Sequence, residues 1–435
     1  TPDTPSREEK PQADCQISLT QTSRFGFSAD VEYTMSSGLQ GPAVNLSFID
    51  RNIFRGGEIF SFRLSTTYEF QVSNKSTQNR NVTNVFEIAA NASIDFPRFL
   101  IPFGTDYIFK SFRARSTVSL GYAFQYKELY SRSVFNAAWG YSWRSNKKSH
   151  FFNPIEVSTV KMLRKSDEFN KILDSNSQRL RYQYEDHFVL NMNYTFIYNE
   201  QTKDNIRDFN YVRVRTETAG ALLYLISKAV SGKMNADKQY EILGLSFSQY
   251  VKLEAEYKHH FVFSQNSSLV FRTLTGAGFA YGNSKMLPYE KSFYVGGSST
   301  LRAWTLYHVG PGSWYNPEYR RMERLGDMTI LFNLEQRFPI YSVFKGAVFI
   351  DAGNIWTLSS ESPYEGGGMS KNFYKEFAVN TGFGLRLDFN YFLIRVDIGI
   401  PILDPAYAEG DRWRWKKNGM KFSDMVINFG IGYPF

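Results

Sequence analysis

Unusually long stretches in which apolar and polar residues alternate are the feature that most constrains how this chain folds. From Phe25 to Ser36 every second residue is apolar, and the residues between are small or polar. The stretches Phe377–Phe389 and Met425–Phe435 alternate in nearly the same way. Because successive side chains of a β-strand point to opposite faces, each stretch would have one apolar and one polar face. Strands of soluble proteins usually have about five or six residues, whereas these reach the roughly 9–11 residues that a tilted strand needs to cross a bilayer.

The composition agrees with membrane-crossing strands and argues against other classes. Aromatic residues make up 17% of the 435 residues, yet no apolar run approaches the roughly 18 residues of a membrane-spanning helix. The formal net charge of +8 is spread along the chain without a nucleic-acid-binding motif, so we expect no nucleic-acid partner. Basic loops suit anionic lipid headgroups instead. The single cysteine, Cys15, alternates with apolar residues, and we interpret it as a small buried hydrophobic side chain.

About sixteen alternating segments occur, and the connections between them alternate in length. Short connections are expected near 53–57, 145–149, 264–268, 339–342 and 390–391, and long ones near 161–184, 227–240, 283–325, 357–375 and 402–421. Short turns on one side and long loops on the other are typical of bacterial outer-membrane barrels. The sequence therefore predicts an all-β fold, a 16-stranded antiparallel transmembrane β-barrel over residues 25–435. Residues 97–112 are an exception, being long where a short turn is due, and one or two helical turns are expected at 166–173.

The first and last strands are predicted to meet at a weak seam. A closed barrel leaves no free strand edge except where residues 25–36 meet residues 424–435. Glycine weakens a strand and proline lacks a ladder N–H, so Gly430, Gly432 and Pro434 limit pairing. We predict fewer backbone hydrogen bonds here than between any other neighbouring strands. The candidate seam residues are Phe27, Val31, Tyr33, Phe429, Gly430, Gly432, Tyr433 and Phe435.

The segment Phe293–Trp304, F-Y-V-G-G-S-S-T-L-R-A-W, is unusually apolar for part of a long loop. A chance aromatic cluster on a surface loop is one interpretation. The other is a loop that folds back and buries itself, which would bury Arg302 and require an anionic partner. By the alternation of the following strands, Glu335 and Asp351 both point into the lumen and are suitable partners. Acidic residues are also ordinary in a wet lumen, so their position alone does not choose between the interpretations.

Common enzyme motifs are missing. No HExxH, GxSxG, CxxC or Walker sequence occurs, and the five histidines show no metal-ligand spacing. We expect no catalytic residues, no metal and no cofactor, and keep a Ser/His lipase-like site inside the barrel as a minor alternative.

Three motifs in order, together with an early segment, give the chain a family resemblance. G-G-S-S-T-L-R-A-W (296–304) resembles the loop-six signature of the BamA/TamA superfamily of outer-membrane assembly and secretion proteins. N-L-E-Q-R-F-P-I (333–340) is similar to its next strand, F-I-D-A-G-N-I-W (349–356) to the motif after that, and F-I-D-R-N-I-F-R-G-G-E (48–58) to an early segment. The resemblance implies that the loop tip folds into the barrel and that the Asp of the later motif receives its arginine. The implied site residues are Gly296, Gly297, Ser298, Leu301, Arg302, Ala303 and Trp304, with Asp351 and Glu335 as lumenal partners.

The resemblance also implies neighbouring domains and a branch. Most members have glycine where this chain has Ala303, and Leu-Arg-Ala-Trp followed by Gly310-Pro311-Gly312 is most similar to the TamA-like lipoprotein branch of Bacteroidetes. Periplasmic POTRA domains precede the barrel in this superfamily. We therefore expect residues 1–24 to be a tail with the last strand of an upstream POTRA-like domain, at Cys15–Leu19, within a longer protein.

The expected function is insertion, assembly or translocation of outer-membrane or surface proteins through a laterally opening seam, without bond chemistry. The expected partners are outer-membrane lipids, client polypeptides and a periplasm-spanning or inner-membrane protein bound by the upstream domains. Two alternatives are a polypeptide-secreting pore of the two-partner type and a passive porin-like channel. A channel needs an open lumen, which a loop folded inward would block.

Overall fold

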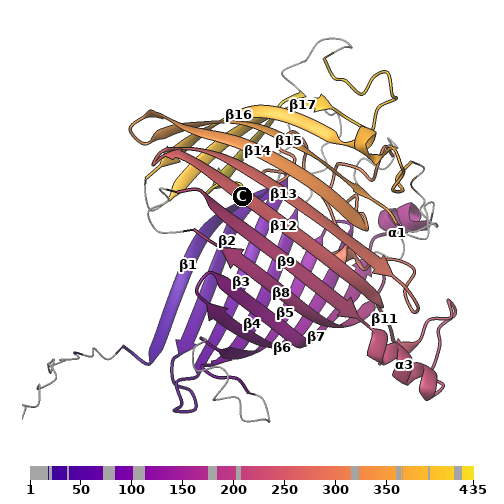
Figure 1. Ribbon diagram of the computed structural model, residues 1–435. Helices are drawn as coiled ribbons and strands as arrows, with labels where there is room; N and C mark the ends of the chain where they lie inside the picture. The colour runs from indigo at the N-terminus through magenta and orange to yellow at the C-terminus, as the bar shows by residue number, and fades with distance from the viewer. Residues whose placement is uncertain are drawn as a thin grey trace, which may run out of the picture.

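One large curved sheet makes up most of the protein in the computed structural model (Figure 1). The structure describes residues 18, 22–36, 39–71, 84–100, 113–174, 184–201, 207–314, 323–358, 364, 366–389, 392–415 and 424–435. The expected short strand at Cys15–Leu19 lies outside these residues apart from Ser18, as does most of the irregular connection at 97–112. Among the described residues, no helix is long and apolar enough to span a membrane.

The described residues form an 18-stranded sheet in which nearly all neighbours are antiparallel. In its first half the strands are β1 (Phe25–Ser36), β2 (Leu39–Asp50), β3 (Ile59–Gln71), β4 (Val85–Phe96), β5 (Arg115–Lys127), β6 (Tyr130–Ser145), β7 (Lys148–Lys165), β8 (His187–Asn199) and β9 (Phe209–Ala219). The second half contains β10 (Glu241–Ile242), β11 (Leu245–Phe247), β12 (Tyr250–Ser264), β13 (Ser267–Ala280), β14 (Met328–Tyr341), β15 (Phe344–Trp356), β16 (Ala378–Asp388), β17 (Leu393–Leu403) and β18 (Val426–Ile431).

The predicted count of sixteen strands is wrong by two. The extra strands, β10 and β11, have two and three residues and lie in the connection between β9 and β12. Strands this short carry no readable alternation, which is why the sequence does not reveal them. The other strands are the predicted long ones, and β12 pairs directly with β9, from Tyr250 opposite Ala219 to His260 opposite Phe209.

The structure agrees with the short and long connections expected from the sequence, but the alternation is not strict, because β5 and β6 are joined through residues 128–129 on the side of the long loops. β6 and β7 are joined through residues 146–147, and β12 and β13 through 265–266, whereas residues 281–327 separate β13 from β14. In the described part of the chain, two α-helices lie in the long connections, at the same end of the sheet: α1 (Asp167–Asp174), where the sequence predicts helical turns, and α3 (Ala221–Ala229) (Figure 1). Short 3₁₀ turns occur at Tyr289–Lys291 and Phe373–Glu376.

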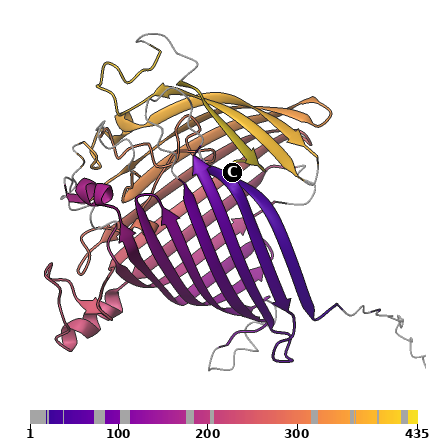
Figure 2. The ribbon, with the colours of Figure 1, turned by 180° about the vertical axis from the view of Figure 1, so that it is seen from behind.

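Polar residues line the inside of the sheet and apolar residues the outside. Buried charged side chains include Glu335, Asp351 and Asp397, whereas exposed side chains on the same strands include Phe332, Val348 and Ile350. This is the reverse of a soluble protein, whose polar residues face water. The two ends of the sheet, β1 and β18, come round toward each other, with the indigo β1 ribbon bordering the yellow last strands (Figure 2). Among the described residues, no ladder joins β1 to β18.

Candidate functional site

The connection between β13 and β14 folds into the sheet's concave interior. Phe293 and Gly326 exchange two backbone hydrogen bonds of 2.8 Å, which close the neck of this loop. Beyond the neck, apolar side chains of the loop and of the surrounding strands form one buried cluster: Phe293, Val295, Leu301, Val309, Leu331, Ile355 and Ala378, with Leu274 and Trp304 packed against it. The segment is therefore buried and is not a surface loop with a chance aromatic cluster.

A double-glycine turn forms the tip of the loop. Gly296 and Gly297 both have positive φ, 110° and 81°, and a Cβ on Gly296 would lie 2.2 Å from the carbonyl oxygen of Thr305. Glycine is therefore required by both conformation and space. The Gly297 N–H donates to the Trp304 carbonyl at 2.7 Å, so the turn closes on itself and presents Arg302 to the strands.

Arg302 is fully buried and binds the two acids expected from the sequence. Its Nε and Nη2 each donate to one oxygen of Asp351 at 2.9 Å, which is a bidentate pair, and its Nη1 donates to Glu335 Oε2. The guanidinium carbon lies 3.3 Å from the centre of the Phe349 ring, a cation–π contact. A bidentate, stacked geometry is specific to arginine and is not reproduced by lysine.

Four strands also grip the backbone of the loop tip. The carbonyls of Ser298, Ser299, Thr300 and Arg302 each accept one hydrogen bond from a lumenal side chain. The donors are Arg395 of β17, Arg272 of β13, Asn333 of β14 and Asn428 of β18, at 2.9, 2.9, 2.7 and 2.8 Å. Ser298 and Arg302 are buried, and a buried carbonyl left without a partner costs about 1–3 kcal/mol.

Each acid of the same cluster is paired with arginine. Glu335 also pairs with Arg337 at 2.8 Å and Arg386 at 3.4 Å. Asp397 pairs with Arg395 at 2.8 Å and lies 3.8 Å from Arg302. We call the group Arg302, Glu335, Asp351 and Asp397, with its arginine and asparagine partners, the lumenal cluster. Every acid in it has at least two cationic or amide partners, as burial of a charge requires.

A second set of contacts holds the loop between β13 and β14. It is centred on Glu323, which is surrounded by aromatic residues. Its carboxylate pairs with Lys127 at 3.0 Å and accepts hydrogen bonds from the hydroxyls of Tyr184 and Tyr289. Burial acts to raise the pKa of Glu323, but the Lys127 charge and the Tyr289 hydrogen bond outweigh it, so the pKa lies below its usual value of 4.5.

The seam contrasts with the lumenal cluster. β1 pairs with β2 along all twelve of its residues, from Phe25 opposite Asp50 to Ser36 opposite Leu39. β18 pairs with β17 over six residues only, ending with Ile431 opposite Ile394. Phe27 of β1 has 82% of its side chain exposed. The free edge of β1 is thus complete, and the strand across from it is short.

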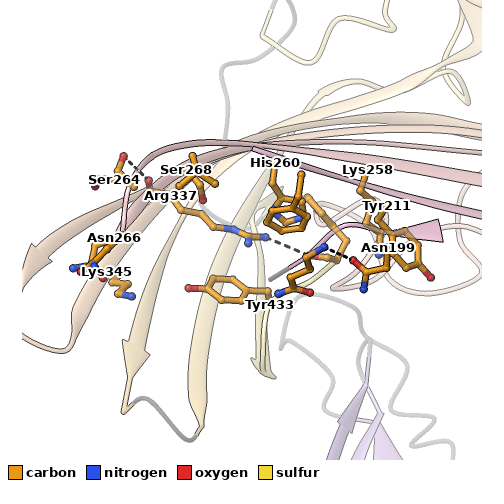
Figure 3. Close-up of a pocket in the computed structure, with 16 residues that line it drawn as sticks. Asn199, Tyr211, Lys258, His260, Ser264, Asn266, Ser268, Arg337, Lys345 and Tyr433 are labelled. Carbon is orange, nitrogen blue, oxygen red and sulfur yellow. Dashed lines mark hydrogen bonds between the residues drawn. The ribbon is translucent and has the colours of Figure 1, made fainter. Parts of the chain in front are cut away.

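The chain turns inward after β18. Gly432 has φ 81°, and Tyr433 beyond it lies under the Arg337 guanidinium, 3.9 Å from guanidinium carbon to ring centre (Figure 3). The Arg337 Nη2 donates to the Phe435 carbonyl oxygen at 3.3 Å. These residues border a cavity of about 380 Å³ near the β12–β13 turn, lined also by Lys258, His260 and Lys345 (Figure 3). Tyr433 and Phe435 therefore do not extend the seam strand as the sequence alone suggests; both contact Arg337 on the inner side of the sheet.

The structure brings some predicted residues together and separates others. Arg302, Glu335 and Asp351 are in contact, and Leu301 and Ala303 are buried beside them. The predicted seam residues of β1 and Phe429 of β18 are instead exposed and lie apart from this cluster. Sequence reasoning did not single out Arg272, Asn380, Arg386, Arg395, Asp397 and Asn428. Their only signal is that each is a polar residue at an inward-facing position of a long alternating strand. Within the described residues, no cluster of His, Cys, Asp and Glu side chains is suited to a metal ion.

Comparison with known proteins gives one family. The model of the Omp85 superfamily domain matches residues 25–435. No curated protein matches. Among solved structures, BamA from Haemophilus ducreyi lacking POTRA domains 1–3 superposes with a TM-score of 0.61 at 12% identity, over 94% of this chain and 70% of that one. CdiB from Acinetobacter baumannii gives 0.48 at 12% identity, over 94% and 60%, and CdiB from Escherichia coli 0.47 at 10%, over 95% and 63%.

Proposed function

The chain belongs to the Omp85 superfamily, and we propose that it inserts or assembles other polypeptides in the outer membrane through the seam between β1 and β18. Members of this family are outer-membrane β-barrel proteins that act as non-enzymatic transporters or assembly factors. The choice between insertion and secretion is the finer step, and it depends on what the seam can do.

The single observation that carries the proposal is the asymmetry of the seam. β1 offers a full-length edge that no described strand covers. The row of unpaired N–H and C=O groups along such an edge is a template for another strand. A client strand that pairs with β1 gains backbone hydrogen bonds without breaking an existing ladder, which is the binding mode called β-augmentation.

The lumenal cluster supports the proposal by arguing against a passive channel. The loop between β13 and β14 fills part of the interior, and its tip is held by strands β13, β14, β15, β17 and β18. A porin-like channel needs an open, water-filled lumen. We call the inward-folded loop between β13 and β14 the plug. The same cluster joins β17 and β18 to the plug, so the β18 side of the seam is held in place and the β1 side is not.

The test is a disulfide across the seam. In a Cys15→Ser background, Ala29→Cys and Phe429→Cys would place thiols on the outward faces of β1 and β18, leaving Asn428 in place. We expect oxidation to stop insertion of an unfolded client β-barrel into vesicles containing the protein, and reduction to restore it. A disulfide needs Cα atoms within about 7 Å, so its formation also reports that the seam can close.

The matched control links two strands that are already paired. Ala29 lies opposite Leu46 in the β1–β2 ladder, so Ala29→Cys with Leu46→Cys should form a disulfide without loss of activity. Full activity in the verified seam-linked protein would refute lateral opening. Release of clients into the vesicle interior, with none inserted in the bilayer, would favour the secretion pore instead.

Two further proposals rest on the motifs alone. POTRA-like domains upstream of residue 25 would receive clients and bind a periplasm-spanning or inner-membrane partner. The Leu-Arg-Ala-Trp tip at 301–304 would place the protein in the TamA-like lipoprotein branch. Co-purification of the full-length protein from native outer membrane tests both, through its partners and its lipidation.

A further inference from the structure

A small structural unit projects from the wall opposite the seam. It comprises residues 220–249, which form α3 and the β10–β11 hairpin between β9 and β12, and it extends beyond the strand ends (Figures 1 and 2). The unit is firmly attached. β11 pairs with β8, and the Asn283 side chain donates to the carbonyls of Tyr240 and Phe247 at 3.0 and 2.9 Å.

The helix in this unit has its polarity reversed for a helix in water. Its side toward the protein carries the buried Ser227, and Tyr224 packs on Tyr240 with ring centres 5.6 Å apart. The opposite side carries Leu222 and Leu225, whose side chains are 65% and 64% exposed, together with Ile226. A surface helix normally buries its apolar stripe, so this stripe faces something other than water.

The hairpin of the unit also has an exposed apolar residue, which is independent evidence for a non-aqueous surrounding. Leu243 occupies the two-residue turn of the β10–β11 hairpin with φ 55°, and its side chain is 90% exposed. Glycine and asparagine are the residues that favour this backbone conformation. A strained, exposed leucine has no stabilising role in the folded chain itself, and such outliers mark functional contacts.

The position of the unit identifies its surroundings. Outward-facing Met192, Thr218, Val251 and Phe279 stand opposite one another in a single row across β8, β9, β12 and β13, and three of them are exposed and apolar. This row belongs to the lipid-facing wall. α3 begins at Ala221, three residues after Thr218, which is at most about 10 Å along the chain. The apolar stripe is therefore continuous with the lipid-facing surface.

We propose that α3 and the Leu243 turn insert into the outer leaflet beside β9 and β12 and anchor this wall in the membrane interface. Lys228, Lys233 and Lys238 are exposed around the unit; Lys233 lies 3.9 Å from Glu241. Such lysines extend to phosphate groups while the apolar residues enter the acyl region, as in interfacial helices. β9 and β12 lie midway between β1 and β18 in the sheet, so movement at the seam takes place against a wall fixed in the bilayer.

Spin labelling of the full chain in vesicles tests the anchor. In the Cys15→Ser background, single cysteines at Leu225 and at Leu243 carry a nitroxide, in bilayers of phosphatidylethanolamine with phosphatidylglycerol. We expect collisions with oxygen, which dissolves in lipid, to exceed those with a water-soluble nickel complex several-fold. Leu253→Cys on the lipid-facing wall of β12 is the positive control, and Glu409→Cys in an exposed loop is the aqueous control.

Each outcome decides the proposal. Labels at positions 225 and 243 that behave like Leu253→Cys support it. Labels that behave like Glu409→Cys overturn it, because the unit then lies in water. Labels shielded from both oxygen and nickel also overturn it, because a second copy or another protein then covers the unit. Both positions are exposed, so labelling disturbs no packed contact, and the heat-dependent gel mobility of the barrel verifies folding.

Discussion

The lumenal cluster and the seam lie side by side in the sheet yet are built in opposite ways. In the cluster each buried charge has several partners, and four strands hold the loop backbone. At the seam a twelve-residue strand edge faces a six-residue strand without a ladder between them in the described part of the chain. The difference shows how rigidity is distributed: the plug fixes one side of the opening, and the other side keeps its pairing capacity for another strand.

The largest expected effect comes from removing the arginine of the cluster. Arg302→Ala removes the bidentate partner of the buried Asp351 and one of the three arginine partners of Glu335, and breaking a buried pair from one side costs about 3–5 kcal/mol. We expect the barrel to unfold at clearly lower urea concentration, as followed by gel mobility. Arg63→Ala, at an exposed position of β3, should change the midpoint little. Equal midpoints for the two variants would show that the plug does not stabilise the barrel.

We expect a smaller loss of stability when an added side chain displaces the loop tip and leaves its charged residues unchanged. A Cβ on Gly399 of β17 would lie 2.3 Å from the Arg302 carbonyl oxygen, so Gly399→Ala should displace the tip at a cost of about 1–3 kcal/mol. Gly410→Ala is the matched control, because nothing lies within 4 Å of its Cβ position. The readout is urea unfolding with seam cross-linking between Ala29→Cys and Phe429→Cys. If Gly399→Ala matches the control, the close packing of tip and wall is not what fixes the plug.

One side-chain hydrogen bond joins strand β18 itself to the loop tip, beside the contacts that Tyr433 and Phe435 make with Arg337. Asn428 of β18 donates to the Arg302 carbonyl at 2.8 Å, and its loss in Asn428→Ala should cost about 1 kcal/mol. We expect faster hydrogen exchange of the β18 amides and little change in β14 and β15. Ile427→Ala, on the outward face, controls for general weakening of the strand. Unchanged exchange in β18 would mean that the plug does not brace the seam.

Mild acid should have the smallest effect and should act on the plug alone. The pKa of Glu323 is lowered from 4.5 in the folded protein, so its ion pair stabilises the loop above pH 4.5 and is lost as pH falls through the folded pKa. Below pH 4.5 we expect added protease to cut the segment around Glu323 faster, with seam cross-linking unchanged. Glu323→Gln should already show that cutting rate at neutral pH and little further change on acidification.

The outer strands and the plug residues differ in how far the sequence reveals them. Period-two alternation identified every long strand and the inward direction of Glu335 and Asp351. It also gave the side of most long connections, but not of 97–114 or of the two-residue connection 128–129. It failed for β10 and β11, because two or three residues carry no period, and for Tyr433 and Phe435, which continue the alternation but turn inward at Gly432. Arg395 and Asn428 were not singled out because a polar residue facing a lumen is ordinary unless its partner is known.

The sequence by itself determined the all-β membrane class, since its long strands have one apolar face and no apolar run is long enough for a membrane-spanning helix. It also showed that Arg302 would need an acid if its loop folded inward. Only the tertiary structure decided which groups meet. Arg302 and Asp351 are 49 residues apart, and Asn428 lies 126 residues beyond Arg302. Such distances are closed by sheet curvature and strand register, which depend on all strands at once. The edge of β1 that no described strand pairs with is likewise known only from the tertiary structure, because it depends on how all the other strands pair.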